Sequence, residues 1–383
     1  GWFWDIPNSG SGQYLRRLMR YLPRVDQTLK ISLIMPPHNP KPDNVPDSIE
    51  VVTTGNKASS SKLGKVWFEQ RTFPKMAKSI GADVAHIPYW GSALSIDIPQ
   101  VVSVLDVIPL LYPLYSGGFF QRLYVEMVTQ SALTADHVIT ISYTSQIDIE
   151  KLIGVAKDRI TVTYLATDDA YHPLMGAEKD EAVREKYNLP DNFVLGGLGF
   201  DARKQVNELL LAYTYVAPTE GATTPLVLAG KQPDWSNPLF PDLPEYIKRL
   251  KLEDYVQWIG YVEEADMPSL YRLADVFAFP SEYEGFGLPP LEAMASGTPA
   301  VVWNSVVADE IYGDGAYFVE TARELGAAIL SLLIQRLESD ICKSLNFIAI
   351  NSHRPWQNKF ARMPNYIIGR ISNYRITINR DCA

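Results

Sequence analysis

The stretch Phe279–Ala300, FPSEYEGFGLPPLEAMASGTPA, decides the fold prediction. It begins at the end of a short apolar run, Val276–Phe279, which is typical of a buried strand. It continues into a helical run that starts at Pro289 and Pro290, and proline suits the first turn of a helix, where its missing N–H is not needed. The segment therefore predicts a strand, a glycine-bearing loop and a helix within an α/β domain.

The same loop predicts an anion site flanked by two carboxylates. Glu284 and Glu292 are eight residues apart, with glycines between them. A carboxylate beside a phosphate is costly unless hydroxyls or cations pair with it, so we expect the glutamates to accept hydrogen bonds from a sugar or ribose. The alternative is that both only cap the helix. The backbone amides expected to approach the phosphate at the helix N-terminus are those of Gly285, Phe286, Gly287 and Leu288.

A second loop, Gly199–Gln205 (GFDARKQ), follows another predicted strand and carries Arg203 and Lys204. An adjacent pair of cations is by itself most often a solvated surface. Here both loops follow strands of one domain, and the carboxyl ends of parallel strands meet at one edge of the sheet. We therefore expect Arg203 and Lys204 to clamp a diphosphate from the side opposite the glycine loop.

Short apolar runs alternate with helical patterns along the rest of the chain, which is typical of βα units and parallel sheets. This predicts an N-terminal Rossmann-like domain over 1–165, a linker over 166–189 and a second Rossmann-like domain over 190–345. The short run Trp2–Ile6 either serves as the first strand, or that strand lies upstream of Gly1. The predicted strands are 30–35, 50–53, 84–87, 100–104, 137–141 and 160–163, then 193–198, 225–229, 256–259, 276–279 and 299–302. The predicted helices are 12–22, 65–80 and 121–134, then a solvated helix over 178–187 within the linker, and 205–216, 243–251, 267–274, 289–295 and 322–335.

Composition restricts the class of protein. The 383 residues are 46% hydrophobic and 21% charged, which fits two or three folded domains. The longest apolar run, 325–334, is far shorter than the roughly 20 residues of a membrane-spanning helix. Cys342 and Cys382 are too few for a disulfide framework or a multi-cysteine zinc site, and we expect no signal peptide before Gly1. We therefore expect a cytoplasmic protein.

Charge is unevenly distributed along the chain. The net charge of −9 combines +6 over 1–80, −20 over 81–333 and +5 over 334–383. The acidic bulk argues against a nucleic-acid partner, which would favour a basic stripe.

The quoted segments, with VQWIGYVEEADMPSLYRLADVFAFPS between them, resemble the retaining GT-B glycosyltransferases of family 4, the group 1 glycosyltransferases, and their mannosyltransferase-like members in particular. The resemblance implies an α/β GT-B fold, with two Rossmann-like domains facing each other across a cleft. It implies a hexosyltransferase that moves a sugar, with retention, from a nucleotide-diphosphate sugar to a hydroxyl acceptor in glycan or glycolipid synthesis. GDP-mannose is the favoured donor and a UDP-sugar the next.

The resemblance also implies roles for individual residues. Glu284 would lie near the donor sugar as a catalytic residue, and Glu292 on the ribose. Arg203, Lys204 and the glycine-loop amides would bind the diphosphate. Gly260 and Tyr261 would lie near the base.

One departure concerns a position near the transferred sugar. Mannosyltransferase-like members carry His-Asp where this chain has Leu105 and Asp106. Asp106 is either a catalytic residue or a strand-end cap. The missing histidine motivates an alternative function, a sugar-nucleotide-binding protein with little turnover. A third reading, an epimerase or dehydrogenase, is weakened by the incomplete glycine fingerprint at Gly10 and Gly12, which we instead expect to approach the donor phosphate or the acceptor.

No metal or resident cofactor is expected. No two aspartates are two residues apart and no histidines have metal-ligand spacing, so the nucleotide sugar is only a co-substrate. His86, Tyr89 and Trp90, at the end of one predicted strand, are candidate acceptor residues, although each is more often structural.

The two basic ends would share one domain if the segment 350–383 packs back on the N-terminal domain, as the resemblance implies. Such a domain suits a polysaccharide or lipid-linked acceptor and a peripheral contact with an anionic membrane at its inner face. Pro364 would break a continuous helix in that segment.

Overall fold

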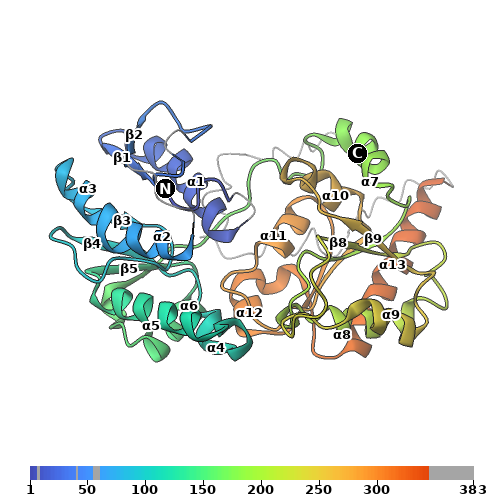
Figure 1. The fold of residues 1–383 in the computed structure, drawn as a ribbon. Helices are drawn as coiled ribbons and strands as arrows, with labels where there is room; N and C mark the ends of the chain where they lie inside the picture. Colours follow the sequence, from blue (N-terminus) through green and yellow to red (C-terminus); the bar gives the residue numbers. More distant parts are fainter. Residues whose placement is uncertain (7–8, 40–41, 55–60, 345–383) are drawn as a thin grey trace. The chain divides into compact units, whose positions relative to one another are not determined.

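The computed structural model describes residues 1–6, 9–39, 42–54 and 61–344. The chain divides into two compact units, Gly1–Tyr164 (unit 1) and Leu165–Ala383 (unit 2). Both contain parallel strands connected by helices, so the α/β prediction is confirmed (Figure 1). The predicted C-terminal segment 350–383 lies outside the described residues.

Unit 2 is built on a six-stranded parallel sheet with the order β12-β11-β10-β7-β8-β9. The chain starts at the centre with β7, winds outward to β9, and returns to the other side of β7 with β10. The direction of winding therefore reverses between β7 and β10, which is where open α/β sheets bind ligands. The strands are β7 (Val194–Gly197), β8 (Leu226–Ala229), β9 (Val256–Gly260), β10 (Val276–Phe279), β11 (Ala300–Trp303) and β12 (Tyr317–Val319).

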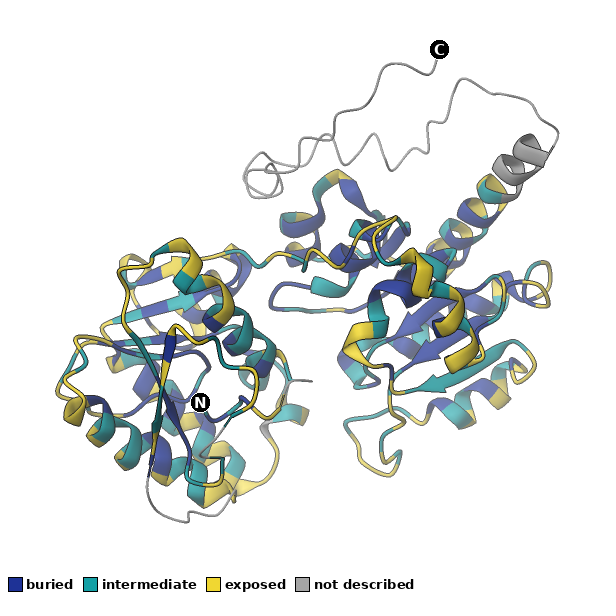
Figure 2. Ribbon diagram, turned by 90° about the horizontal axis from the view of Figure 1, so that it is seen from above, coloured by how far each residue is buried: buried dark blue, intermediate teal, exposed yellow. Residues whose placement is uncertain are grey.

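Helices cover both faces of this sheet, so its central strands are apolar throughout and buried (Figure 2). The helices after the first two strands, α8 (Val206–Val216) and α9 (Leu243–Leu250), share a core with α13 (Ala322–Ser344). The others are α10 (Met267–Leu273), α11 (Leu288–Ala295) and α12 (Val306–Tyr312). Part of the segment predicted as a linker forms α7 (Asp180–Tyr187), which packs against α10.

Unit 1 contains two parallel sheets, β1-β2 and β3-β4-β5-β6. Their strands are β1 (Ile31–Met35), β2 (Ile49–Thr53), β3 (Ala85–Ile87), β4 (Gln100–Ser103), β5 (His137–Thr140) and β6 (Ile160–Val162). The helices are α1 (Gly10–Val25), α2 (Lys62–Trp67), α3 (Phe73–Ser79), α4 (Ile108–Leu111), α5 (Phe119–Thr134) and α6 (Tyr143–Leu152). A π-helical turn, η1 (Phe68–Thr72), joins α2 to α3.

Every predicted strand of the two alternations is present, within two residues of its predicted bounds. Trp2–Ile6 is not a strand, because its backbone bonds run locally, from Trp4 N–H to Gly1 O and from Ile6 N–H to Phe3 O. These turns bury Trp2 and Trp4. No helix among the described residues is long and apolar enough to cross a membrane.

Candidate functional site

The loops that follow β7 and β10 meet at the carboxyl edge of the unit 2 sheet. Arg203 and Lys204 lie in a 3-10 turn, η5 (Ala202–Lys204), after β7, and Glu284 lies after β10. The two strands are hydrogen-bonded neighbours, so their carboxyl ends lie side by side. A backbone bond of 3.0 Å from Glu282 N–H to Arg203 O ties the loops together. The structure thus brings together the two loops that the sequence predicted to converge.

Glu284 is the centre of this site. Its Oε1 lies 2.7 Å from Arg203 Nη1 and 2.6 Å from Lys204 Nζ. The Ser281 hydroxyl donates to the same oxygen at 2.7 Å. Within the described part of the chain these donors all go to Oε1, so both cations and the hydroxyl converge on one side of the carboxylate. We call Arg203, Lys204, Ser281 and Glu284 the cation–carboxylate cluster.

The cluster is largely shielded from water. The side chains of Arg203, Lys204 and Glu284 are 8%, 11% and 16% exposed. Burial alone would raise the pKa of Glu284, but the charges of Lys204 and Arg203 and its hydrogen bonds hold that pKa below its ordinary value. Arg203 Nη1 also donates to the carbonyl of Tyr283, which fixes the loop after β10. The site is therefore an ionised, preorganised cluster.

The glycine loop is held in its conformation by a buried tyrosine. Gly287 has φ +84° and is the N-cap of α11. Its carbonyl accepts a 2.8 Å hydrogen bond from Tyr312 Oη, and a Cβ at Gly287 would lie 2.0 Å from that oxygen. Only glycine fits, both for its left-handed backbone and for this close approach. Phe286 is buried, which leaves the backbone as the part of this loop suited to meet a ligand.

Glu292 has a different set of neighbours from Glu284. It lies on α11, is 8% exposed, and accepts a hydrogen bond of 3.3 Å from Tyr271 Oη. Burial, and then the charge of Glu292, raise the pKa of Tyr271 well above its ordinary range, so the phenol remains a donor. The tyrosine was not predicted from the sequence, because its place in a mostly apolar helix gives no polar signal.

The loops after β8 and β9 lie at the same carboxyl edge. Gly260, with φ +73°, ends β9, and its carbonyl accepts a 2.7 Å bond from Gly230 N–H at the end of β8. Tyr261, which follows, is 51% exposed. Sequence reasoning missed an aromatic cluster at this end of the sheet, in which the Phe200 and Trp258 ring centroids are 5.0 Å apart.

Unit 1 holds the other predicted residues. Asp106 follows β4, and its Oδ1 accepts a 3.1 Å bond from Ile108 N–H, as a strand-end cap does. The carbonyl of the neighbouring Leu105 accepts a 3.2 Å bond from Ser145 Oγ. Gly10 is the first residue of α1 and has open space around its Cα. Gly12 is buried, and a Cβ there would lie 2.0 Å from Ile6 O. This glycine therefore lets the start of α1 pack closely against the backbone of the preceding turns.

His86 belongs to a hydrogen-bonded chain between β3, β4 and α1. Its Nε2 lies 2.9 Å from Ser103 Oγ, and that hydroxyl donates to Tyr14 Oη at 3.2 Å. Burial lowers the pKa of His86 to about 4, so the ring is neutral at pH 7. These contacts hold the imidazole within unit 1, and an acceptor-binding role for His86 stays a prediction.

The other two candidate acceptor residues also make the contacts of core residues. Tyr89 is 4% exposed, and its ring lies edge-on to Phe3 with centroids 4.7 Å apart. The Trp90 indole donates to Val128 O at 3.0 Å. Both stay assigned to acceptor binding only as a prediction.

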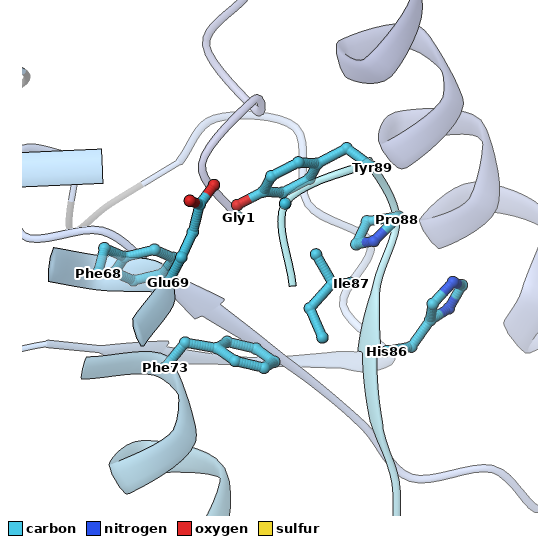
Figure 3. A pocket seen from close by; sticks show the side chains of 9 residues that line it. Gly1, Phe68, Glu69, Phe73, His86, Ile87, Pro88 and Tyr89 are labelled. Atoms are coloured by element: carbon cyan, nitrogen blue, oxygen red, sulfur yellow. The ribbon is translucent and has the colours of Figure 1, made fainter. Parts of the chain in front are cut away.

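An unpredicted buried carboxylate lies beside Tyr89. Glu69, on η1, has its carboxylate directed toward the Tyr89 hydroxyl, whereas His86 points away (Figure 3). Glu69 also accepts bonds of 3.1 and 3.2 Å from Tyr124 Oη and lies 3.4 Å from Lys65 Nζ. The adjoining cavity has a volume of about 20 Å³, which suits a water molecule rather than a sugar. No group of three or more potential metal-ligating side chains occurs in the described residues.

Both halves of the chain match family models of glycosyltransferases. Residues 180–345 match the model of glycosyl transferases group 1, and residues 8–171 match that of glycosyltransferase family 4. The Escherichia coli O-antigen chain mannosyltransferase B is 34% identical over 219 residues. That alignment covers 57% of this chain and 56% of the relative, so the chain spans little more than half of that protein.

Solved structures support the fold. Anabaena Alr3699/HepE, crystallised with UDP and glucose, superposes with a TM-score of 0.57 at 22% identity, over 75% of this chain and 77% of the other. WaaG, a glycosyltransferase involved in lipopolysaccharide biosynthesis, superposes with a TM-score of 0.62 at 15% identity, over 86% and 88%. With two parallel-sheet α/β units and a matching family model on each, the chain belongs to the group 1 glycosyltransferases of the GT-B fold, and its relatives include mannosyltransferases.

Proposed function

We propose that the protein transfers a hexose from a nucleoside-diphosphate sugar to a hydroxyl of a glycan or glycolipid. The observation that carries this proposal is the cation–carboxylate cluster, in which Arg203 and Lys204 meet Glu284 at the point where the winding of the unit 2 sheet reverses. This is the place where α/β sheets bind nucleotides. Two cations beside a glycine loop and a helix N-terminus suit a diphosphate.

The donor would replace interactions that the cluster now makes internally. The diphosphate would accept hydrogen bonds from Arg203 and Lys204, and the Glu284 carboxylate would accept one from a sugar hydroxyl. As the bond to the sugar breaks, charge develops on the leaving diphosphate, and these cations would stabilise it without a metal. Because the cluster is shielded from water, the interactions of the two cations with the diphosphate would be strong.

The remaining donor contacts are assigned from the family resemblance. Glu292 would bind the ribose hydroxyls, and Gly260 with Tyr261 would lie near the base. We favour GDP-mannose because the resemblance is to mannosyltransferase-like members and the E. coli relative is named a mannosyltransferase. A UDP-sugar is second, because the Anabaena structure contains UDP. The same proposal includes retention of the anomeric configuration, a catalytic role for Asp106 and a membrane-linked acceptor.

Leu105 supports a second candidate, a protein that binds sugar nucleotides with little turnover. The Ser145 bond to its carbonyl fixes the backbone here, so a histidine side chain could replace leucine without remodelling the loop. If this candidate holds, the protein as given turns over donor very slowly and Leu105→His raises the rate. Ordinary enzymatic rates in the unchanged protein would contradict it.

Calorimetry and turnover assays with GDP-mannose, GDP-glucose, UDP-glucose and UDP-galactose test the main proposal. We expect the protein to bind either the GDP-sugars or the UDP-sugars in preference. We also expect it to transfer or slowly hydrolyse the sugar of the preferred donor with retention of the anomeric configuration. Product anomers are distinguished by NMR. Failure to bind any of these donors contradicts the proposal.

A further inference from the structure

One peptide unit, between Gly287 and Leu288, joins the glycine loop to α11. Gly287 is the N-cap of that helix and Leu288 is its first residue. The N–H groups of the first helical turn have no carbonyl partner within the helix. The Leu288 N–H is therefore one of the amides that a phosphate at this helix N-terminus would bind.

Tyr312 fixes the orientation of this peptide unit. The tyrosine is the last residue of α12 and is 2% exposed, and its Oη donates to Gly287 O at 2.8 Å. Burial, and then the charge of Glu284, raise the pKa of Tyr312 well above its ordinary range, so the phenol stays protonated and remains a donor. The Gly287 carbonyl is thus held toward the buried end of α12.

The amide of the same peptide unit points the other way. In a planar trans peptide the C=O and N–H bonds have opposite directions. Because the Gly287 carbonyl is directed at Tyr312 Oη, the Leu288 N–H is directed away from the buried phenol. The hydrogen bond on one side of the peptide therefore determines what is presented on the other side.

This peptide unit is free to turn over if that hydrogen bond is removed. Glycine accepts backbone torsions that other residues avoid, and Gly287 has φ +84° and ψ +60°. A turned peptide would present its carbonyl oxygen where the N–H now lies, and the partial negative charge of that oxygen would repel a phosphate. The orientation of one peptide therefore decides whether this position attracts or repels a diphosphate.

The peptide unit lies beside the cation–carboxylate cluster. A Cβ at Gly287 would lie 3.9 Å from the Glu284 Cβ, and the charge of Glu284 acts on Tyr312. Arg203 and Lys204 meet on that same glutamate. A diphosphate that took the place of Glu284 as their partner would therefore lie next to the glycine loop.

We propose that Tyr312 is a positioning residue for the donor: its hydrogen bond to Gly287 O keeps the peptide turned so that the Leu288 N–H, and not the carbonyl, meets the diphosphate. Tyr312 acts through this peptide and does not itself contact the donor. The proposal rests on the proposed function and deepens it by naming a residue outside both site loops. As the bond between sugar and diphosphate breaks, charge grows on the diphosphate, so losing the tyrosine hydroxyl should lower kcat as well as affinity.

Tyr312→Phe tests the proposal, because it removes the hydroxyl and keeps the ring. The matched control is Tyr213→Phe. Tyr213 is also buried, and its hydroxyl also donates to a backbone carbonyl, that of Thr224, which precedes β8 at the opposite end of the sheet. Both variants should lose similar stability, because each removes the phenol donor of one buried carbonyl.

Calorimetry with GDP and UDP measures the effect on the diphosphate contact. Tyr312→Phe should raise the Kd of the nucleoside diphosphate that binds by about 10-fold, as loss of one hydrogen bond to a charged group does, and Tyr213→Phe should leave it unchanged. The Kd of the matching nucleoside, guanosine or uridine, followed by NMR titration, should stay the same in both variants because a nucleoside has no phosphate. A purely structural role of Tyr312 would weaken the binding of both ligands alike.

The Leu288 amide can also be observed directly. The sequence contains two Gly–Leu pairs, Gly197–Leu198 and Gly287–Leu288, so labelling glycine carbonyls with carbon-13 and leucine amides with nitrogen-15 selects two NMR signals. The Leu198 N–H donates to Ala229 O at 2.8 Å and serves as the reference, and Leu288→Ile assigns the other signal. Saturating nucleoside diphosphate should shift the Leu288 amide proton downfield in the unchanged protein, and much less in Tyr312→Phe.

The outcomes separate this proposal from the proposed function. If a nucleoside diphosphate binds but Tyr312→Phe leaves its Kd unchanged, weakens the nucleoside equally, or the Leu288 amide of the unchanged protein does not shift, the role of Tyr312 is overturned and the donor site stands. If neither GDP nor UDP binds the unchanged protein, the proposed function fails, and the role of Tyr312 fails with it.

Discussion

Lys204 and Glu284, which are 80 residues apart in the sequence, form an ion pair with Nζ 2.6 Å from Oε1. Arg203 reaches the same oxygen, so one carboxylate balances two cations of the neighbouring loop. This arrangement depends on β7 and β10 being adjacent. It gives unit 2 a cluster whose two cations could exchange the Glu284 carboxylate for a diphosphate.

Glu284→Gln should destabilise unit 2 by about 1–3 kcal/mol at pH 7, because Arg203 and Lys204 lose the charge that offsets their burial. The depressed pKa of Glu284 means that its stabilising contribution is present above the ordinary pKa of a glutamate and is lost as the pH falls through the lower folded-state value. The variant's denaturation midpoint should therefore change less between pH 7 and acid pH than that of the unchanged protein. Equal acid sensitivity in the two proteins would contradict this assignment.

Gly287→Ala should destabilise the protein by several kcal/mol and abolish donor binding, because the new Cβ would meet Tyr312 Oη at 2.0 Å on a backbone with φ +84°. Gly176→Ala is the matched control, since Gly176 also has a left-handed backbone, with φ +78°, but the nearest heavy atom to its Cβ position lies at an ordinary 3.7 Å. The control should cost only about 1–2 kcal/mol. Thermal melts of both variants measure the difference, and equal losses would show that the contact with Tyr312 is unimportant.

Glu69 should make unit 1 less stable as pH rises. Burial raises its pKa to about 7 despite the opposing effects of Lys65 and of its hydrogen bonds. Since the folded-state value lies above the unfolded one, stability is fully present below the ordinary pKa of about 4.5 and falls as pH rises toward 7. Glu69→Gln should remove this slope, worth up to about 3 kcal/mol. Urea titrations at pH 5 and pH 8 measure it, and an unchanged slope in the variant would assign the effect elsewhere.

Arg272→Ala should release the segment that enters unit 2. The Arg272 side chain is 5% exposed, lies 2.6 Å from Asp180 Oδ1, and donates to the carbonyls of Met175 and Gly176 at 3.0 and 3.1 Å. Its removal takes a donor from the part-buried Asp180 carboxylate and Gly176 carbonyl and from the exposed Met175 carbonyl, and should cost about 1–3 kcal/mol. Limited proteolysis should then cut near residues 170–180 faster. Arg323→Ala, at an exposed arginine on α13, is the control and should melt and digest as the unchanged protein does.

The sequence predicted the parts of the fold that repeat a strong pattern. Runs of four or five apolar residues, such as Val276–Phe279, predict the buried strands. The convergence of Arg203 with Glu284 follows because the carboxyl ends of parallel strands meet at one edge of a sheet. The short strand β12 and helix α12 were missed, because a three-residue strand such as Tyr317–Val319 is too short to show a period. Trp2–Ile6 resembles a strand by composition, but its residues fold into turns that bury two tryptophans.

Other site features depend on tertiary contacts that no local pattern encodes. Tyr271 reaches Glu292 from another helix, and Glu69 is joined to Tyr124 across 55 residues. Glu69 lies between Phe68 and Gln70 in a helical run, and such a carboxylate looks like a surface residue until its neighbours in space are known.

Binding of GDP and UDP to the full chain, measured by calorimetry beside Lys204→Ala and Lys248→Ala, tests the central claim most directly. The proposal predicts that one nucleoside diphosphate binds, and that Lys204→Ala raises its Kd by about 10- to 100-fold, as loss of a charged hydrogen bond should. Lys248→Ala, at an exposed lysine on α9, should leave the Kd unchanged. If neither nucleotide binds, or if Lys204→Ala binds as tightly as the unchanged protein, the cation–carboxylate cluster is not a donor site.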